Sequence, residues 1–305
     1  MRDVKFVDRV SLILKSGRGG DGSSKRKFFR GKYINIGGDG GRGGDVYIQA
    51  NPNIFDLSKY LSKKEYSAFS GEPGLSARKK GADAKPLILD VPVGTIVKDV
   101  SGKVIGDLIL PYKPILIVSG GEGGKGNYKR DKTISPKPGF VREVVLDLRI
   151  CADVVVVGFV NSGKSTLISN ISNLTPKISE FPFTTKIPVQ AVVNRGYKHF
   201  VILEIPAFSN EKSGKDLGVK FLKHINRAKV LLFLLSAEGD PQQQLSALRK
   251  VLDRNYPLYR NKSSLIVVNK TDKIKEENIK GAVYISAKEP EVIDVLLDKI
   301  FKALE

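Results

Sequence analysis

The sequence predicts two domains, an all-β glycine-rich half followed by an α/β half built on a parallel sheet. Three observations carry this prediction. Residues 1–150 hold 23 of the 30 glycines. In that half short β-type runs alternate with glycine-rich stretches, whereas in the second half β-type runs alternate with helix-type segments. A composition shift this sharp marks a domain boundary, so we expect domains at 1–149 and 150–305.

The charge balance points to a polyanionic partner. The chain has 51 Lys and Arg against 32 Asp and Glu, a net charge of +19. Nucleic acid or an acidic membrane face would suit this excess, and a lysine-rich genome is the milder explanation.

A single cysteine excludes an internal disulfide framework, and two histidines leave little scope for a histidine-based site. No apolar run approaches the ~20 residues of a membrane span, and no targeting segment is visible.

The first half contains five strand-like runs, at 4–15, 45–50, 86–100, 113–120 and 141–150. The glycine-rich stretches between them lie at 17–22, 37–45, 71–83 and 120–127. Flexible loops are one interpretation of these stretches. Glycines two or three residues apart also suit extended segments packed side by side, where only a residue without Cβ fits. The pattern leaves both interpretations open.

The second half predicts a parallel sheet covered by helices. Its apolar β-type runs lie at 153–157, 200–205, 230–235 and 264–268, and its helix-like segments at 164–173, 217–228, 241–254 and 290–304. Strands that alternate with helices in this way form a parallel sheet with helices on both faces.

A phosphate-binding loop is the strongest chemical signal in the chain. A buried-type strand leads into Gly158-x4-Gly163-Lys164-Ser165 and then into a helix start. Glycines let backbone N–H groups turn inward on a phosphate, and the helix N-terminus adds its positive end. We expect Lys164 to reach the β- and γ-phosphates and Ser165 to bind Mg²⁺. The binding loop comprises Gly158, Phe159, Val160, Asn161, Ser162, Gly163, Lys164 and Ser165.

A second motif specifies the base. The segment Asn269, Lys270, Thr271 and Asp272 follows an apolar strand, where a loop at the carboxyl end of the sheet begins. The Asp272 carboxylate can accept two hydrogen bonds from N1–H and the exocyclic amine of guanine, which adenine cannot supply. The next strand leads into Ser286, Ala287 and Lys288, a loop that can offer a backbone N–H to guanine O6. Asp272 therefore disfavours an ATP-using kinase.

Taken together with the glycine-rich stretches, these motifs make the whole chain resemble the Obg GTPases. The stretches FVDRVSLILKSGRGGDG, GGDGGRGGDVYI, VPVGTIVKD and GGEGGKGN look like the glycine-rich N-terminal domain of that family, and GFVNSGKSTL, FPFTTKIP and GVKFLKHINRAKVLL look like its G domain. The resemblance implies an eight-stranded β barrel with packed polyproline-II-like helices, followed by a Ras-like G domain. Many family members carry a further C-terminal domain, and we expect none in this chain.

The resemblance also implies ligands and roles. The switch I segment would be Phe183, Thr184, Thr185, Lys186 and Ile187, with Thr185 as a second protein ligand to Mg²⁺ besides Ser165. Asn161 occupies the position that some relatives use to help hold K⁺. As in the family, hydrolysis would rest on Lys164, Thr185, Mg²⁺ and positioned water, and it would be slow without a stimulating partner.

The third GTPase element departs from the family pattern. Where the family has Asp-x-Pro-Gly, this chain has Glu204, Ile205, Pro206 and Ala207, and Val160 replaces a typical proline. Glu204 keeps a carboxylate that would hold Mg²⁺ through water, one methylene longer. Ala207 keeps the N–H that would meet the γ-phosphate. No residue offers itself as a general base: we expect His199 at the surface and His224 facing solvent or a partner.

Basic side chains gather in the first half, which carries a net charge of +12. Lys25, Arg26, Lys27, Arg30 and Lys32 form one cluster, and Arg78, Lys79 and Lys80 form another. A single charge cluster usually marks a solvated face, but two clusters on glycine-rich loops favour contact with rRNA. Phe28, Phe29 and Tyr33 could stack on bases or lie in the core.

Two hypotheses follow. The first is a monomeric GTP-binding and GTP-hydrolysing factor that acts in large ribosomal subunit assembly, in bacterial cytoplasm or in an organelle. Its Obg domain would dock on rRNA while its G domain senses GTP or GDP with Mg²⁺. The second is a placeholder on pre-ribosomal particles with negligible GTPase activity, motivated by Glu204 and Ala207.

Overall fold

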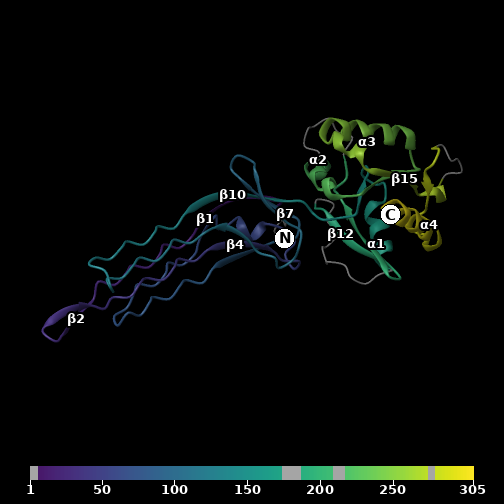
Figure 1. The fold of residues 1–305 in the computed structure, drawn as a ribbon. Coiled ribbons are helices and arrows are strands. Elements are labelled where there is room, and N and C mark those ends of the chain that lie inside the picture. The colour runs from purple at the N-terminus through teal and green to yellow at the C-terminus, as the bar shows by residue number, and fades with distance from the viewer. Residues whose placement is uncertain (1–5, 174–186, 209–216, 274–278) are drawn as a thin grey trace. The chain divides into compact units, whose positions relative to one another are not determined.

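The computed structural model describes residues 6–173, 187–208, 217–273 and 279–305 (Figure 1). The chain divides into two compact units, Met1–Leu148 and Arg149–Glu305. No helix in these described ranges is long and apolar enough to cross a membrane.

The N-terminal unit contains two main sheets and a hairpin. The five-stranded sheet has the order β5-β1-β10-β7-β8 and the three-stranded sheet the order β6-β4-β9. The bounds are β1 Arg9–Lys15, β2 Arg26–Phe29, β3 Lys32–Asn35, β4 Val46–Ala50, β5 Glu65–Ser67, β6 Leu87–Val91, β7 Thr95–Asp99, β8 Val104–Leu108, β9 Ile115–Val118 and β10 Val141–Leu148, with a 3-10 turn at Ser58–Tyr60. The eight-stranded barrel stays a prediction, because these strands pair as separate sheets.

Alternating residues of these strands form the core of the unit. In β1 the side chains of Val10, Leu12 and Leu14 are buried, while Ser11 and Ile13 between them are exposed. Such alternation turns one face of a strand toward the core. β2, β3, β5 and β8 were not among the strands expected from the sequence, and the run at 86–100 is two strands, β6 and β7.

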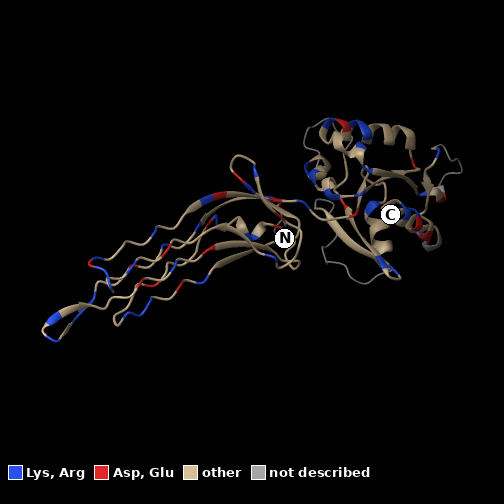
Figure 2. Cartoon of the chain, viewed as in Figure 1, with Lys and Arg blue, Asp and Glu red and all other residues tan. Residues whose placement is uncertain are grey.

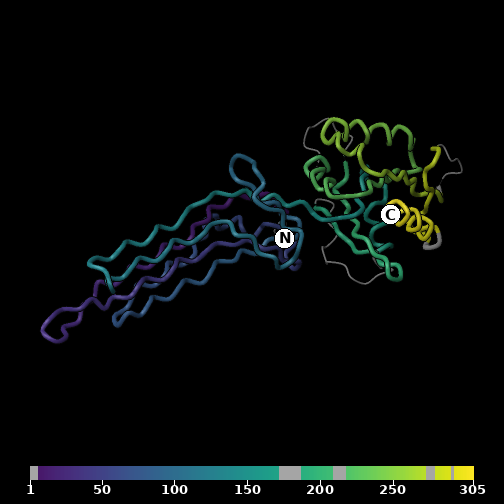
Figure 3. Tube along the Cα trace, viewed as in Figure 1, coloured from purple at the N-terminus to yellow at the C-terminus, as the bar shows by residue number. Residues whose placement is uncertain are grey.

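Between the sheets and the far end of this unit, the glycine-rich stretches run side by side (Figures 1 and 3). Three of them form a closed set of backbone hydrogen bonds: Gly20 N–H donates to Gly41, Gly40 to Gly124 and Gly124 to Gly20, each at 2.8 Å. A Cβ added at Gly40 would lie 2.0 Å from the carbonyl oxygen of Gly20. The structure therefore decides for packed extended segments over loops.

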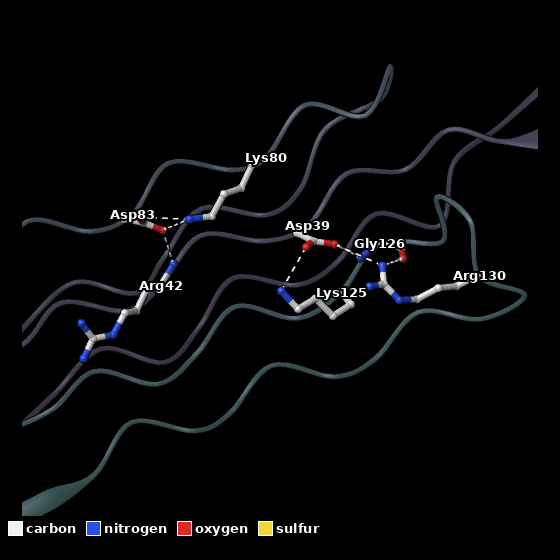
Figure 4. A network of polar contacts seen from close by, with 7 residues as sticks. All are labelled: Asp39, Arg42, Lys80, Asp83, Lys125, Gly126 and Arg130. Carbon is white, nitrogen blue, oxygen red and sulfur yellow. Dashed lines mark hydrogen bonds and ion pairs between the residues drawn. The ribbon is translucent and has the colours of Figure 1, made fainter.

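Carboxylates supply acceptors where these segments meet (Figure 4). The Asp39 carboxylate accepts from Gly126 N–H at 2.8 Å and from Lys125 Nζ at 3.1 Å, and Asp83 accepts from Arg42 N–H at 2.6 Å. Burial alone would raise the pKa of Asp39, but the Gly126 N–H, Lys125 and Arg130 together lower it. The Asp residues in the glycine-rich stretches thus join neighbouring segments.

The C-terminal unit has a six-stranded sheet of order β12-β13-β11-β14-β15-β16, parallel except for the antiparallel β12–β13 pair. The bounds are β11 Val154–Val157, α1 Lys164–Asn173, β12 Val189–Arg195, β13 Lys198–Glu204, α2 Leu217–Phe221, β14 Val230–Ser236, α3 Pro241–Asn255, β15 Ser263–Asn269, β16 Val283–Tyr284 and α4 Pro290–Leu304, with 3-10 turns at Leu222–Arg227, Pro257–Asn261 and Thr271–Lys273. The predicted strands and helices are confirmed, except that 217–228 is a short helix followed by a 3-10 turn.

The sheet is buried on both faces. Val154, Val156 and Leu232 lie in one apolar cluster with residues of α1 and α4. Alternate residues such as Leu231 and Phe233 are equally buried and point to the opposite face, because successive strand side chains alternate. The sheet therefore holds the loops at the carboxyl ends of β11, β14 and β15 on a rigid base.

The expectation that His224 faces solvent is wrong. His224 is fully buried, its Nδ1 accepts from Ile150 N–H at 3.1 Å, and its ring stacks on Phe221. Because the segment after Phe221 tightens into a 3-10 turn, a helical projection misplaced this side chain. His199 is exposed, as predicted.

Candidate nucleotide site and basic tip

The loop between β11 and α1 is folded around its own lysine. Lys164 Nζ donates to the carbonyl oxygens of Phe159 at 2.8 Å and Gly158 at 3.2 Å, and the side chain is buried. Burial lowers the pKa of Lys164 to about 8, while the Glu204 carboxylate opposes this shift. An ammonium held in this loop is placed to meet an anion that enters it.

Two glycines of this loop have no room for a side chain. Gly163 has φ +91°, and a Cβ there would lie 2.1 Å from Asn269 Nδ2. At Gly158 a Cβ would lie 2.5 Å from the Leu234 carbonyl oxygen and 2.8 Å from Ser162 Oγ. Asn161 also has a positive φ, +63°, which asparagine tolerates better than most residues.

The segment from Glu204 to Phe208 lies beside the phosphate-loop residues. Phe208 N–H donates to Gly158 at 3.2 Å, and Val160 N–H donates to Phe208 at 3.3 Å. Ile205 and Pro206 are buried and Ala207 is half-buried. Phe208 was not expected from the sequence, and it is the residue that pairs this segment with the loop.

Glu204 contacts the first turn of α1 directly. Its Oε1 accepts a hydrogen bond from Ser165 Oγ at 2.8 Å, and its side chain is buried at the end of β13. Burial raises the pKa of Glu204, while the Ser165 hydrogen bond and the Lys164 charge act in the opposite direction. Glu204, one methylene longer than the aspartate of the family pattern, therefore contacts the Ser165 hydroxyl, which the sequence predicts to be a Mg²⁺ ligand.

Asn269 joins the phosphate loop to the predicted base loop. Its Nδ2 donates to the Ser162 carbonyl at 2.9 Å, and its Oδ1 accepts from Ala287 N–H at 2.8 Å. Ser162, Asn269 and Ala287 are all buried. The phosphate loop and the 286–288 loop, more than 120 residues apart, are thus parts of one site.

The remaining residues of the base motif frame this site. Lys270 has φ +67° and its Nζ forms an ion pair with Glu238. Thr271 N–H donates to Ile285, which brings the 271–273 turn beside the end of β16. Asp272 and Lys288 are exposed, whereas Ser286 is buried. An exposed carboxylate beside a buried loop is accessible to a ligand.

Some predicted site residues are not placed. Phe183, Thr184, Thr185 and Lys186 lie outside the described residues, and Ile187 is buried. Conversely, Glu238 and Asn170 were missed. Asn170 donates from Nδ2 to the Ala287 carbonyl. Asn170 lies three residues after the buried Leu167, next to the apolar face of α1. A polar residue at this position of the helix is the sequence signal that could have identified it.

A second surface lies at the far end of the glycine-rich segments, where Figure 2 shows basic residues around the β2–β3 hairpin. We define it as the basic tip, residues 25–36, 75–80 and 128–133. It contains eleven Lys and Arg residues and one Asp. The three loops are joined, because Arg78 N–H donates to Ile36, Asn35 Nδ2 donates to Arg130, and the Arg78 guanidinium lies over the Tyr128 ring at 4.3 Å.

Aromatic rings accompany this charge. Phe28 and Tyr33 face each other across the β2–β3 hairpin with ring centroids 5.2 Å apart, and they are 61% and 71% exposed. Phe29 is 48% exposed beside Arg30. These rings lie at the surface, not in the core, which resolves the alternative that the sequence left open.

The chain has a glycine-rich strand-to-helix loop that ends in Lys-Ser, and Asn269 of the Asn-Lys-x-Asp segment is hydrogen-bonded to this loop. These two features define a P-loop nucleotide-binding protein of the GTPase class. Two family models match the chain, GTP1/OBG over residues 7–144 and 50S ribosome-binding GTPase over residues 153–270.

Curated relatives match over most of the chain. GTPase Obg of Prosthecochloris aestuarii (strain DSM 271 / SK 413) is 40% identical over 289 residues, covering 90% of this chain and 88% of that protein. GTPase Obg of Chlorobium phaeobacteroides (strain BS1) is 36% identical over 325 residues, covering 99% of each. GTPase Obg of Thermosipho africanus (strain TCF52B) is 39% identical, covering 92% of this chain and 68% of that protein. The chain belongs to the Obg family of GTPases.

Proposed function

We propose that residues 150–305 are a G domain that binds and slowly hydrolyses GTP. The observation that carries this proposal is the Asn269 side chain, which joins the Ser162 carbonyl to the Ala287 amide. It supports one ligand with phosphates on Gly158–Ser165 and a guanine at Asp272 and the Ser286–Lys288 loop. Asp272 then reads the base by accepting two hydrogen bonds.

The oxygen atoms near α1 fit Mg²⁺. Ser165 Oγ and Glu204 Oε1, both hard oxygen donors, lie 2.8 Å apart at the loop where the phosphates would bind. Ser165 would bind the ion directly and Glu204 would hold it through water, with Thr185 as a further ligand. Bound Mg²⁺ neutralises charge on the β- and γ-phosphates. Lys164 would hold the terminal phosphates. The Ala207 N–H would contact the γ-phosphate, and Asn161 would help to hold K⁺.

Nucleotide calorimetry tests this proposal. We expect the protein to bind GDP and GTP in the presence of Mg²⁺ and to bind ADP far more weakly. Lys164→Ala should abolish this binding, while Lys198→Ala, an exposed lysine of the same unit, should leave it unchanged. Equal affinity for ADP and GDP would contradict guanine recognition.

A restoring variant tests the departure from the family pattern. Glu204→Asp/Ala207→Gly recreates Asp-x-Pro-Gly. If the altered element slows hydrolysis, this variant should release phosphate from GTP faster than the natural chain, with GDP affinity nearly unchanged. The same rate in both proteins would mean that the altered element does not limit hydrolysis.

We further propose that the glycine-rich domain, residues 1–149, docks on rRNA of the large ribosomal subunit or its precursor. The basic tip supports this proposal, because eleven cations and exposed rings suit phosphates and unpaired bases. The family model that matches residues 153–270, described as 50S ribosome-binding GTPase, supports the large subunit as the partner of the chain, not the choice of domain that docks. The finding that curated relatives are GTPases does not favour the placeholder without turnover.

Sedimentation with large subunits at several salt concentrations tests the docking proposal. Binding should weaken as salt rises, because phosphate contacts release counterions. Changing Lys25, Lys27 and Lys32 to Glu should abolish co-sedimentation. Changing Lys64, Lys103 and Lys113 to Glu, exposed lysines of the same unit outside the tip, should weaken it much less. Equal losses would show that charge alone, not the tip, governs binding.

A further inference from the structure

Both backbone polar groups of Ala287 are held by asparagine side chains. Its N–H donates to Asn269 Oδ1 at 2.8 Å, and its carbonyl accepts from Asn170 Nδ2. Ala287 is 4% exposed, so neither group has ready access to water. The position of this residue therefore depends on two amide side chains, one at the end of β15 and one on α1.

Asn170 lies on the helix that begins at the phosphate loop. Lys164 starts α1, and Asn170 follows six residues later, between the fully or nearly fully buried Leu167 and Ile171. An amide at the edge of an apolar helix face is retained without penalty when it satisfies a buried carbonyl. Here that carbonyl belongs to the base loop, so Asn170 connects α1 to the 286–288 loop.

We propose that Asn170 is a positioning residue for guanine recognition, holding the 286–288 loop so that one of its backbone N–H groups meets O6 of the base. This inference rests on the proposed binding of guanine nucleotides. The phosphate and base regions are then joined twice, through Asn269 to the Ser162 carbonyl and through Asn170 to α1. Asp272 would contact the neighbouring N1–H and 2-amino groups of the base, which is a separate contact from the one to O6.

Three diphosphates separate these two contacts. GDP carries O6, N1–H and the 2-amino group, inosine diphosphate lacks only the amino group, and 6-thioguanosine diphosphate keeps N1–H and the amino group but has sulfur, a much weaker acceptor, in place of O6. Calorimetry compares their affinities for the full chain and for Asn170→Ala and Asn170→Asp. Asn255→Ala is the matched control, because its Nδ2 also donates to a backbone carbonyl, that of Val251, in α3.

The natural chain should prefer GDP to both analogues. In both Asn170 variants the preference for GDP over the analogue with sulfur in place of O6 should fall about tenfold, the effect of losing one well-placed hydrogen bond. The preference for GDP over inosine diphosphate should stay. The Asn255 control should keep both preferences.

The outcomes that overturn the inference are distinct from those that overturn the proposed function. If the natural chain prefers GDP and the Asn170 variants keep its preference for O6, Asn170 has no positioning role, even if thermal stability falls. If Asn170→Ala does not fold, Asn170→Asp, of the same size, decides. If the natural chain does not prefer GDP to ADP, the proposed function fails and the inference fails with it.

Discussion

Each unit of this chain is stabilised internally by a different kind of packing. In the N-terminal unit the glycine-rich segments meet backbone to backbone, with Gly20, Gly41 and Gly124 in one hydrogen-bonded set and no space for a Cβ. In the C-terminal unit the sheet meets its helices through interdigitated apolar side chains, such as Leu232, Leu167 and Ile300. The packing of the glycine-rich segments requires residues without a side chain. The packing of the sheet on its helices requires large apolar side chains, which can repack.

This difference predicts different responses to substitution. A backbone contact cannot yield to an added methyl group, because the neighbouring carbonyl is fixed by its own hydrogen bonds. An apolar core loses stability in proportion to the atoms removed and relaxes in part. Substitutions in the two units therefore separate the two modes of packing.

The largest effect is expected for Gly40→Ala. Its Cβ would lie 2.0 Å from the Gly20 carbonyl oxygen, so the three central segments must separate. We expect a loss of about 4 kcal/mol, at the extreme of single substitutions. Hydrogen exchange across 16–24, 37–45 and 119–127 measures it. Gly239→Ala, where the new Cβ meets only the end of Gln244 at 3.2 Å, is the control, and equal losses would contradict the contrast.

A core truncation in the other unit should cost somewhat less. Leu232→Ala removes a fully buried side chain from β14, and we expect a loss of about 3 kcal/mol in the free energy of unfolding. Urea unfolding measures it. Leu258→Ala, at a residue that is 60% exposed, should cost under about 0.5 kcal/mol. A similar cost for both variants would argue against a core centred on β14.

The phosphate loop shows both kinds of packing. Gly163 has a positive φ and no space for a Cβ, and it packs against the side chain of Asn269. Gly163→Ala should displace Asn269 from the Ser162 carbonyl and lower GDP affinity about a hundredfold, or ~2.7 kcal/mol. Calorimetry measures the affinity, and urea unfolding shows whether the fold persists. Retained affinity would mean that Asn269 does not organise the site.

The smallest effect concerns the carboxylates between glycine segments. The lowered pKa of Asp39 means that its ionised form stabilises the folded unit above the unfolded pKa, and that this stability is lost as pH falls through the folded value. Asp39→Asn should therefore cost about 1 kcal/mol at pH 7 and progressively less below pH 4. Urea unfolding at several pH values measures the change, with Asp131→Asn, in an exposed loop, as the control. A cost that stays constant down to pH 2 would exclude ionisation as its origin.

Prediction from the sequence succeeded where a local pattern carried the information. The β11–α1 loop, the helices α1, α3 and α4 and the parallel strands of the sheet follow from periodicity and glycine spacing, which act over a few residues. The prediction for His224 was wrong because the turn after Phe221 departs from helical geometry. β2 and β3 were missed because neither strand alternates buried with exposed residues: β2 is exposed throughout, and in β3 the first two residues are exposed and the last two half-buried.

The sequence by itself determined that this chain has a glycine-rich half, a phosphate loop and an Asn-Lys-x-Asp segment, because each is a property of neighbouring residues. Only the tertiary structure decided that the glycine stretches pack together and that Asn170 reaches Ala287. It also decided that Glu204 reaches Ser165. Such contacts join residues far apart in the sequence, 21 positions for Gly20 and Gly41 and 117 for Asn170 and Ala287, and their geometry depends on how the sheet and the segments assemble rather than on any local pattern.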